Sequence, residues 1–238
     1  MKLDILAFGA HPDDVEIGSS GTLILHIQKG YKCGIIDLTR GELGTRGTAD
    51  TREKESKVAS KLIGIHLREN LFMEDGFFQN DKINQLKIVT IIRKYKPEII
   101  LCNAITDRHP DHSRAAALIS TAIFLAGLEK VETFFESILQ ERWKVKSHYH
   151  YLQDRHIKPD IAVDISSVWD KKMEAVKAFT SQFYNPNSTE PETEISRKDF
   201  LEFLSGRAME MGRPLGVQYA EGFNAPRLPG VTDLFNLL

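Results

Sequence analysis

Residues 3–14 read LDILAFGAHPDD and carry the clearest structural signal of the chain. Residues 3–9 form a short, mostly apolar run that ends in Gly9, and the chain then turns polar. A short apolar run bounded in this way is typical of a strand that is buried within a parallel sheet. We therefore expect a central strand over residues 3–9, with the cluster HPDD just beyond its carboxyl end.

Strand-like and helix-like segments alternate after this first strand. Apolar runs predict further strands over residues 33–38, 70–72, 98–103, 147–152 and 160–165. Helical spacing of apolar side chains predicts helices over residues 22–29, 51–63, 83–95, 113–126, 168–179 and 196–211. Such alternation favours right-handed βαβ units. The expected fold is α/β and Rossmann-like, a doubly wound single domain whose mainly parallel sheet carries helices on both faces.

Composition excludes several classes of protein. The 238 residues are 42% hydrophobic and 27% charged, which are globular proportions and not those of a disordered or collagen-like chain. The net charge is −2, so nothing predicts the basic surface of a nucleic-acid-binding protein. The N-terminus lacks the apolar region of a signal peptide, and no run is long enough to span a membrane. Cys33 and Cys102 are expected to be buried free thiols in a cytoplasmic protein that binds neither nucleic acid nor a membrane.

A second polar cluster, DRHPDH at residues 107–112, follows the predicted strand at residues 98–103. In a doubly wound sheet of order 3-2-1-4, the first and fourth strands are neighbours at the topological switch point. Ligands bind in the crevice beyond the carboxyl ends of these strands. The two clusters are therefore expected to face each other although nearly a hundred residues separate them.

Histidine and aspartate in these clusters predict a catalytic zinc site. Such sites commonly use three protein ligands and leave one position open for water. His11 and Asp14 can both point at one ion from a tight turn, and His112 can supply the third ligand from the facing loop.

The remaining polar residues of the clusters are predicted to do the acid–base chemistry. Asp13 is expected to act as general base beside the metal, and His109 is expected to donate to a developing oxyanion or leaving group. Asp111 is expected to hold His109 in one tautomer. Glu16 is interpreted as a helix-dipole or supporting carboxylate.

A glycine-rich loop over residues 39–48 is expected to border the same crevice. Its glycines permit close backbone approach, and arginines there suit an anionic substrate group. We predict that Arg46, Arg52, Arg108 and Glu42 contact the substrate. The loop has neither the Walker A sequence nor the GxGxxG turn of nucleotide-binding proteins.

Simpler interpretations stay open for each pattern taken alone. HPDD is also a plausible helix-capping turn, and HPDH a polar loop with an incidental histidine pair. His26 and His66 carry no ligand pattern, and His148 and His150 fit the alternation of a half-buried strand. Two other functions also fit the crevice, namely a non-catalytic sugar- or nucleotide-binding module and a zinc phosphoesterase.

The paired clusters HPDD and HPDH resemble the zinc-dependent N-acetylglucosaminide de-N-acetylases of the LmbE type, over nearly the whole chain. Residues 39–47 and 217–223 look like the bacillithiol branch, whose substrate is N-acetylglucosaminyl malate. The resemblance implies His11, Asp14 and His112 as zinc ligands, Asp13 as base, and His109 as the electrostatic partner oriented by Asp111. It also implies one deacetylase domain over residues 1–238, an N-acetylglucosaminyl substrate with an anionic aglycone, and a homo-oligomer.

One family feature has no counterpart here. Some relatives place a mobile tyrosine near the oxyanion, but the segment around Phe200 offers no such residue. The turn-rich stretch over residues 185–194 is predicted to be a mobile loop.

Overall fold

A seven-stranded sheet runs through the molecule in the order β3-β2-β1-β4-β7-β9-β8. The computed structural model describes residues 1–237. The strands of this sheet are β1 (Ile5–Gly9), β2 (Cys33–Asp37), β3 (Leu67–Asn70), β4 (Ile99–Cys102), β7 (Ser147–Tyr151), β8 (Ile161–Asp164) and β9 (Ala220–Asn224). The neighbouring pairs β3–β2, β2–β1, β1–β4 and β4–β7 are parallel. Strand β9 runs antiparallel to both β7 and β8. The expected neighbour order 3-2-1-4 is confirmed.

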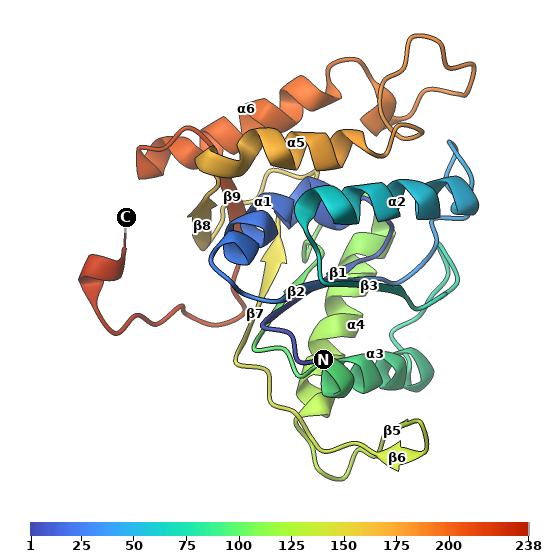
Figure 1. Cartoon of the computed structure of the whole chain (residues 1–238), viewed down its shortest axis with the longest axis vertical. Helices are drawn as coiled ribbons and strands as arrows, with labels where there is room; N and C mark the ends of the chain where they lie inside the picture. Colours follow the sequence, from blue (N-terminus) through green and yellow to red (C-terminus); the bar gives the residue numbers. More distant parts are fainter. Residues whose placement is uncertain (238) are drawn as a thin grey trace.

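Helices cover both faces of the sheet, as predicted (Figure 1). One face carries α1 (Asp14–Gln28), α2 (Ala49–Ile63) and α5 (Trp169–Lys177), and α6 (Phe200–Gly212) lies over β9. The opposite face carries α3 (Lys82–Tyr95) and α4 (Pro110–Ala126), which pack against each other. A short hairpin of β5 (Phe134–Phe135) and β6 (Ile138–Leu139) projects beside α3. Four short 3₁₀ turns are η1 (Ser166–Val168), η2 (Glu194–Ser196), η3 (Arg213–Leu215) and η4 (Leu234–Asn236).

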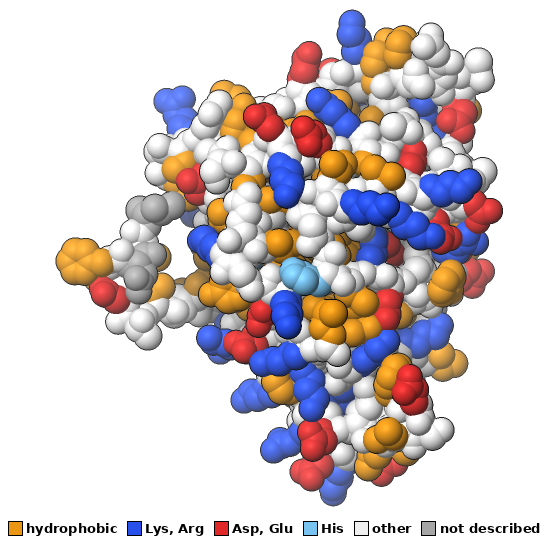
Figure 2. Space-filling view, viewed as in Figure 1, with side chains coloured by type: hydrophobic (Ala, Val, Ile, Leu, Met, Phe, Trp, Pro, Cys, Tyr) orange, Lys and Arg blue, Asp and Glu red, His pale blue; other side chains and the backbone are white. Residues whose placement is uncertain are grey.

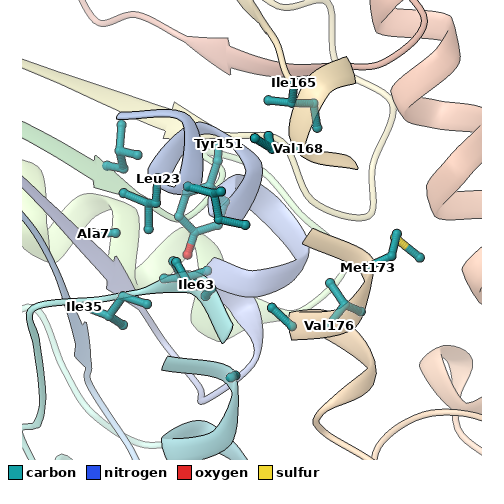
Figure 3. Packing of buried hydrophobic residues seen from close by; sticks show 14 of the residues in the cluster. Ala7, Leu23, Ile35, Ile63, Tyr151, Ile165, Val168, Met173 and Val176 are labelled. Atoms are coloured by element: carbon teal, nitrogen blue, oxygen red, sulfur yellow. The ribbon is translucent and has the colours of Figure 1, made fainter. Parts of the chain in front are cut away.

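The core on the α1 face is built around Tyr151 of β7 (Figure 3). This ring is fully buried, and its hydroxyl donates to the carbonyl oxygen of Phe8 at 2.9 Å. Gly18 of α1 lies against the ring so closely that a Cβ there would come within 2.3 Å of it. The missing side chain therefore lets the first half of α1 pack directly on the sheet.

The largest departures from the sequence predictions are at α1, β3 and β9, and the short hairpin of β5 and β6 was not predicted either. Helix α1 begins at Asp14 and not near residue 22, because residues 18–21 (GSSG) are weak helix formers that tertiary packing holds in the helix. Strand β3 lies at Leu67–Asn70, earlier than predicted, because its polar residues on a half-buried edge give no apolar run. Strand β9 was not predicted, because its sequence AEGFN breaks the apolar pattern.

Other expectations hold. Cys33 and Cys102 are buried free thiols. Within residues 1–237, no helix combines the length and apolar character needed to cross a bilayer. On the face shown in Figure 2, basic side chains are interspersed with acidic ones and with apolar patches.

Candidate active site

The two polar clusters lie side by side at the carboxyl edge of the sheet. Strands β1 and β4 are paired neighbours, so the segments that leave them enter the same crevice. Asn103, the first residue after β4, ties these segments together. Its Oδ1 accepts the N–H of Ala10 at 3.0 Å, and its Nδ2 donates to Asp14 Oδ2 at 3.0 Å.

The three predicted metal ligands are brought together and buried. The exposed fractions of His11, Asp14 and His112 are 8%, 4% and 9%. Asp14 Oδ1 lies 3.0 Å from His112 Nε2, and Asp14 Oδ2 lies 3.5 Å from His11 Nδ1. Ligand atoms of His11, His109 and His112 also lie within 4.8 Å of one another. The sequence prediction that these side chains share one site thus agrees with the geometry.

The site is built to hold positive charge. Burial disfavours a protonated imidazole, yet the carboxylates of Asp111, Asp14 and Asp75 raise the pKa of His11 well above its ordinary value. Burial likewise opposes the charged form of His112, but Asp14 and Asp107 raise its pKa to about 9. A bound metal ion supplies positive charge to the same carboxylates. A buried set of two imidazoles and one carboxylate therefore fits a divalent transition metal.

Further carboxylates orient the histidine rings. The Nδ1 of His112 lies 2.5 Å from Asp107 Oδ2, which leaves Nε2 facing Asp14. The Nε2 of His11 lies 3.0 Å from Asp75 Oδ1 and 3.3 Å from Asp111 Oδ2. Such outer carboxylates fix the tautomer and direction of metal-binding histidines. Asp75 was missed by sequence reasoning because it stands outside both clusters, in the segment that follows β3.

Gln153 is a second residue of the site that the sequence did not indicate. It follows β7 by two residues, and its Nε2 donates to Asp14 Oδ1 at 3.0 Å. Its Oε1 accepts from Asn103 Nδ2 and from the N–H of Ala104, at 3.0 and 3.1 Å. The Gln153 amide is neither an acid nor a base, so no sequence pattern indicated a role for it. Only the order of the strands in the sheet brings it beside Asp14.

Asp13 is a buried carboxyl in an unusual backbone conformation. It precedes α1 with φ 119° and ψ −26°, a region that non-glycine residues rarely adopt. Burial raises the pKa of Asp13 to about 7, against the opposing charge of Arg52. A group with this pKa can both accept and donate a proton near neutral pH.

His109 and Asp111 are arranged differently from the prediction. The Asp111 carboxylate does not orient the His109 ring: it contacts His11 and accepts from the N–H of Gly76 at 2.9 Å and from Arg114 Nη1 at 2.5 Å. It is the backbone N–H of Asp111 that donates to His109 Nδ1, at 3.3 Å, because His109 caps α4. Burial and the charges of His11 and His112 lower the pKa of His109. A neutral ring with Nδ1 as acceptor carries its proton on Nε2.

A cavity of about 440 Å³ opens from this centre. His11, Asp13, Asp14, His109 and His112 line one part of it. The remaining lining includes apolar residues of the segment that leads into α6 and of α6 itself, which are Ile195, Phe200, Phe203 and Leu204.

Four arginines line the same cavity, of which Arg46, Arg52 and Arg108 were predicted. Arg46 is buried and donates from Nε to the carbonyl oxygen of Ser181 at 3.0 Å. Arg108 is half-exposed, with its Nε 3.3 Å from Asp154 Oδ2. Arg207 on α6 was missed, because a single arginine in an amphipathic helix indicates only a solvated face. Its Nη2 is buried and has no hydrogen-bond partner among residues 1–237.

The glycine-rich loop borders the cavity through residues 43–46, as predicted, and its glycines pack around Arg52. A Cβ at Gly41 would come within 2.4 Å of Arg52 Nη1, so the loop wraps the guanidinium, which donates to Gln182. Glu42 is not among the residues that line the cavity, contrary to the prediction. Its carboxylate turns back on the chain and accepts the N–H of Asp75 at 3.2 Å and of Arg40 at 3.1 Å.

A buried His/Asp/His cluster with an adjacent carboxyl, at the switch point of a doubly wound sheet, defines a metal-dependent hydrolase. Residues 6–123 match the family described as PIG-L: GlcNAc-PI de-N-acetylase. The conserved protein TT1542 from Thermus thermophilus is 34% identical, with a TM-score of 0.87 over 98% of each chain. The chain therefore belongs to the PIG-L/LmbE family and is an enzyme of its deacetylase class, which excludes the binding-module interpretation.

Other relatives act on different molecules. The diacetylchitobiose deacetylase of Thermococcus kodakarensis is 28% identical over 237 residues, which is 95% of this chain and 84% of that protein. A "Probable N-acetyl-alpha-D-glucosaminyl L-malate deacetylase 2" of Bacillus anthracis is 24% identical over 195 residues, 75% of this chain and 81% of that protein. The 4-oxalmesaconate hydratase of Pseudomonas putida is 26% identical over 190 residues, 74% of this chain and 73% of that protein. These relatives differ in substrate and, for the hydratase, in reaction, so the substrate of this chain has to be inferred from its site.

Proposed function

We propose that this protein is a zinc-dependent deacetylase that removes the acetyl group from an N-acetylglucosaminyl conjugate with an anionic aglycone, of which N-acetylglucosaminyl malate is the expected example. One observation carries the proposal. A buried His11/Asp14/His112 set, with Asp13 and His109 beside it, opens into a cavity that four arginines line.

His11, Asp14 and His112 would hold the metal through two imidazole nitrogens and one carboxylate. When bound, zinc supplies Lewis-acid activation of a water molecule and of the acetyl carbonyl group. Asp107 and Asp75 support this set by fixing the ring nitrogens of His112 and His11.

Asp13 moves the proton in this scheme. Its pKa of about 7 suits it to take a proton from the attacking water as the water oxygen bonds to the acetyl carbon. The same carboxyl then returns the proton to the amine nitrogen as the carbon–nitrogen bond breaks. One water is consumed, and acetate and a free amine leave.

His109 stabilises the negative charge that develops on the carbonyl oxygen. Its Nδ1 accepts from the N–H of Asp111, so Nε2–H is free to donate toward the reacting centre. We expect this neutral ring to act as a hydrogen-bond donor.

The arginines support an anionic aglycone. Arg207 and Arg108 both line the cavity, and the buried Nη2 of Arg207 has no partner among the residues that the structure describes. A desolvated guanidinium of this kind is a natural partner for a carboxylate of the substrate. The same charges would suit a phosphate ester, but the family relatives favour amide cleavage.

The test is acetate release from N-acetylglucosaminyl malate, diacetylchitobiose and free N-acetylglucosamine, each with zinc and with a chelator. We expect chelator-sensitive release that is fastest from the malate conjugate. Equal release from all three would keep the deacetylase and remove the anionic aglycone. No release from any of them by zinc-loaded protein would contradict the proposed function.

A further inference from the structure

A buried ion pair packs against the middle of α1. Lys172 of α5 and Glu221 of β9 are 1% and 5% exposed, and Lys172 Nζ lies 2.6 Å from Glu221 Oε1. Glu221 stands in the stretch at residues 217–223 that the sequence singled out and that the proposed chemistry does not use.

The pair is bonded to the backbone in the middle of α1. Glu221 accepts the N–H of Gly21 at 2.9 Å and the N–H of Thr22 at 2.7 Å. Lys172 Nζ donates to the carbonyl oxygen of Ile17 at 2.7 Å and to that of Glu16 at 3.2 Å.

In a regular helix, two of these backbone groups would form a hydrogen bond with each other. In an α-helix the N–H of Gly21 donates to the carbonyl oxygen of Ile17, four residues earlier. Here that N–H donates to Glu221 and that carbonyl accepts from Lys172, within a helix that runs without a break from Asp14 to Gln28. These two contacts tie this turn of α1 to β9 and to α5.

The residues around this point make room for the ion pair. A Cβ at Gly21 would lie 2.9 Å from Glu221 Oε1, so a larger residue there would displace the carboxylate. A small cavity of about 30 Å³ adjoins it, lined by Ile17, Lys172, Glu221 and Arg207 among others. Ile17 and Arg207 also line the large cavity, so the ion pair borders the active site.

The first turns of α1 lie before this point. They begin at Asp14, and Asp13 immediately precedes them. A second ion cluster holds them from the other side, because Glu16 Oε1 lies 2.6 Å from Arg68 Nη1. The direction of these first turns therefore depends on two buried charged contacts, one on each side.

Stability alone is a weak reason for burying Lys172 and Glu221. The cost of desolvating two charges commonly cancels their attraction, and well-packed apolar replacements are often neutral or stabilising. We propose that Lys172 and Glu221 are positioning residues, which fix the direction of the first turns of α1 and thereby the place of Asp14 among the metal ligands. The inference rests on the proposed metal site and not on the identity of the substrate.

The test compares zinc affinity, measured by competition with a chromogenic chelator, in wild type and in the double variant Lys172→Met/Glu221→Leu. Replacing both partners avoids an unpaired buried charge, so we expect the double variant to fold. Its zinc affinity should fall roughly 10–100-fold, the usual cost of losing an outer support of a metal ligand. If the wild type also releases acetate, kcat should fall with the affinity while KM stays unchanged.

The matched control is Ile92→Val or Ile92→Ala on α3, whichever lowers Tm by the same amount as the double variant. Ile92 is buried in the core on the opposite face of the sheet, so its variants should bind zinc as the wild type does. Wild-type zinc affinity in a folded double variant would overturn the proposal.

A milder variant is included in case the double variant does not fold. Glu221→Gln keeps the shape and one acceptor oxygen, and we expect an intermediate loss of zinc affinity. If both variants fail to fold, the pair is a folding element and the proposal is wrong. If the wild type binds zinc but releases no acetate, the proposed substrate fails while the zinc comparison still decides this inference.

Discussion

At Asp13 the chain holds a buried carboxyl at φ 119°, in a region where a side chain is strained. Strain of this kind costs on the order of 1–3 kcal/mol and persists where the surroundings fix it. Burial adds a second cost, which appears as the raised pKa of about 7. Both costs arise because the fold holds Asp13, the proposed proton-transferring group, beside the proposed metal ligands.

Replacing Asp13 should separate stability from turnover. Asp13→Gly removes the strain and the buried carboxyl, at a smaller entropic cost of about 0.5–1 kcal/mol, so we expect a higher Tm than wild type. Asp13→Asn keeps the strain and serves as its matched control. Both should lose about 10²–10⁴-fold in kcat and retain zinc. Thermal unfolding, zinc content and acetate release measure the three effects, and near-normal turnover in either variant would refute the role of Asp13.

Asp107 contacts the proposed metal ligand His112, whose Nδ1 lies 2.5 Å from Asp107 Oδ2. Asp107→Asn keeps the shape and loses the charge that fixes the ring, so zinc affinity should fall roughly 10–100-fold. The exposed pair Arg197 and Asp199 provides the control, because Asp199→Asn removes an exposed carboxylate that does not line the cavity. Chelator competition measures both, and equal affinities in the two variants would count against an orienting role for Asp107.

At the scale of elements, the sequence predicted best where a whole element is buried. β1, β2 and β4 are short apolar runs, and their burial on both faces makes the run itself the signal. The polar clusters follow β1 and β4, so predicting these two strands was enough to bring the proposed metal ligands to one edge of the sheet.

Elements that depend on distant partners were not predictable in the same way. The first half of α1 contains Gly18 and Gly21, which lower helix propensity, and it is helical because Tyr151 and Glu221 hold it. β9 carries Glu221 for the same contact. Local helix propensity depends on neighbouring residues only. It therefore carries no information on Glu221, which lies 200 residues after Gly21 in the sequence.

Helix α6 gives the cavity its outer wall, and Arg207 is the charged residue of that wall. We expect Arg207→Met to raise KM for N-acetylglucosaminyl malate and to leave KM for diacetylchitobiose unchanged, because only the first carries a carboxylate. Ser205→Ala, on the same helix but outside the cavity, is the control. Steady-state kinetics on both substrates provide the measurement. An equal rise in KM for both would show that Arg207 shapes the wall without reading charge.

At the scale of the whole molecule, the site is assembled from segments that only the sheet brings together. His11 and His112 arrive from β1 and β4, whereas Asp75 and Gln153 arrive from β3 and β7. The first two could be predicted because their clusters have a recognisable chemistry at adjacent strand ends. The last two could not, because a lone aspartate or glutamine acquires its role only from the neighbours that the sheet order supplies.

His148 on β7 is expected to make the free energy of unfolding depend on pH. Burial, with the charges of His150 and Arg227, lowers its pKa to about 4, and its buried Nε2 has no hydrogen-bond partner within the described part of the chain. In the unfolded chain a histidine titrates near 6.5, so between about pH 6.5 and about pH 4 the unfolded state binds a proton that the folded state excludes. The contribution of the neutral ring to stability is therefore complete above about pH 6.5 and is lost as the pH falls through this window.

Removing this histidine should flatten that pH dependence. We expect the free energy of unfolding of His148→Gln to fall less than that of wild type between pH 7 and pH 4.5, as measured by urea unfolding at several pH values in this range. His156→Gln, at an exposed position, should follow the wild-type curve because its ring is already in water. The carboxylates of the active site titrate in all three proteins, so the difference between the curves isolates His148. Parallel curves for all three would mean that the β7 ring takes up its proton without disturbing the strand.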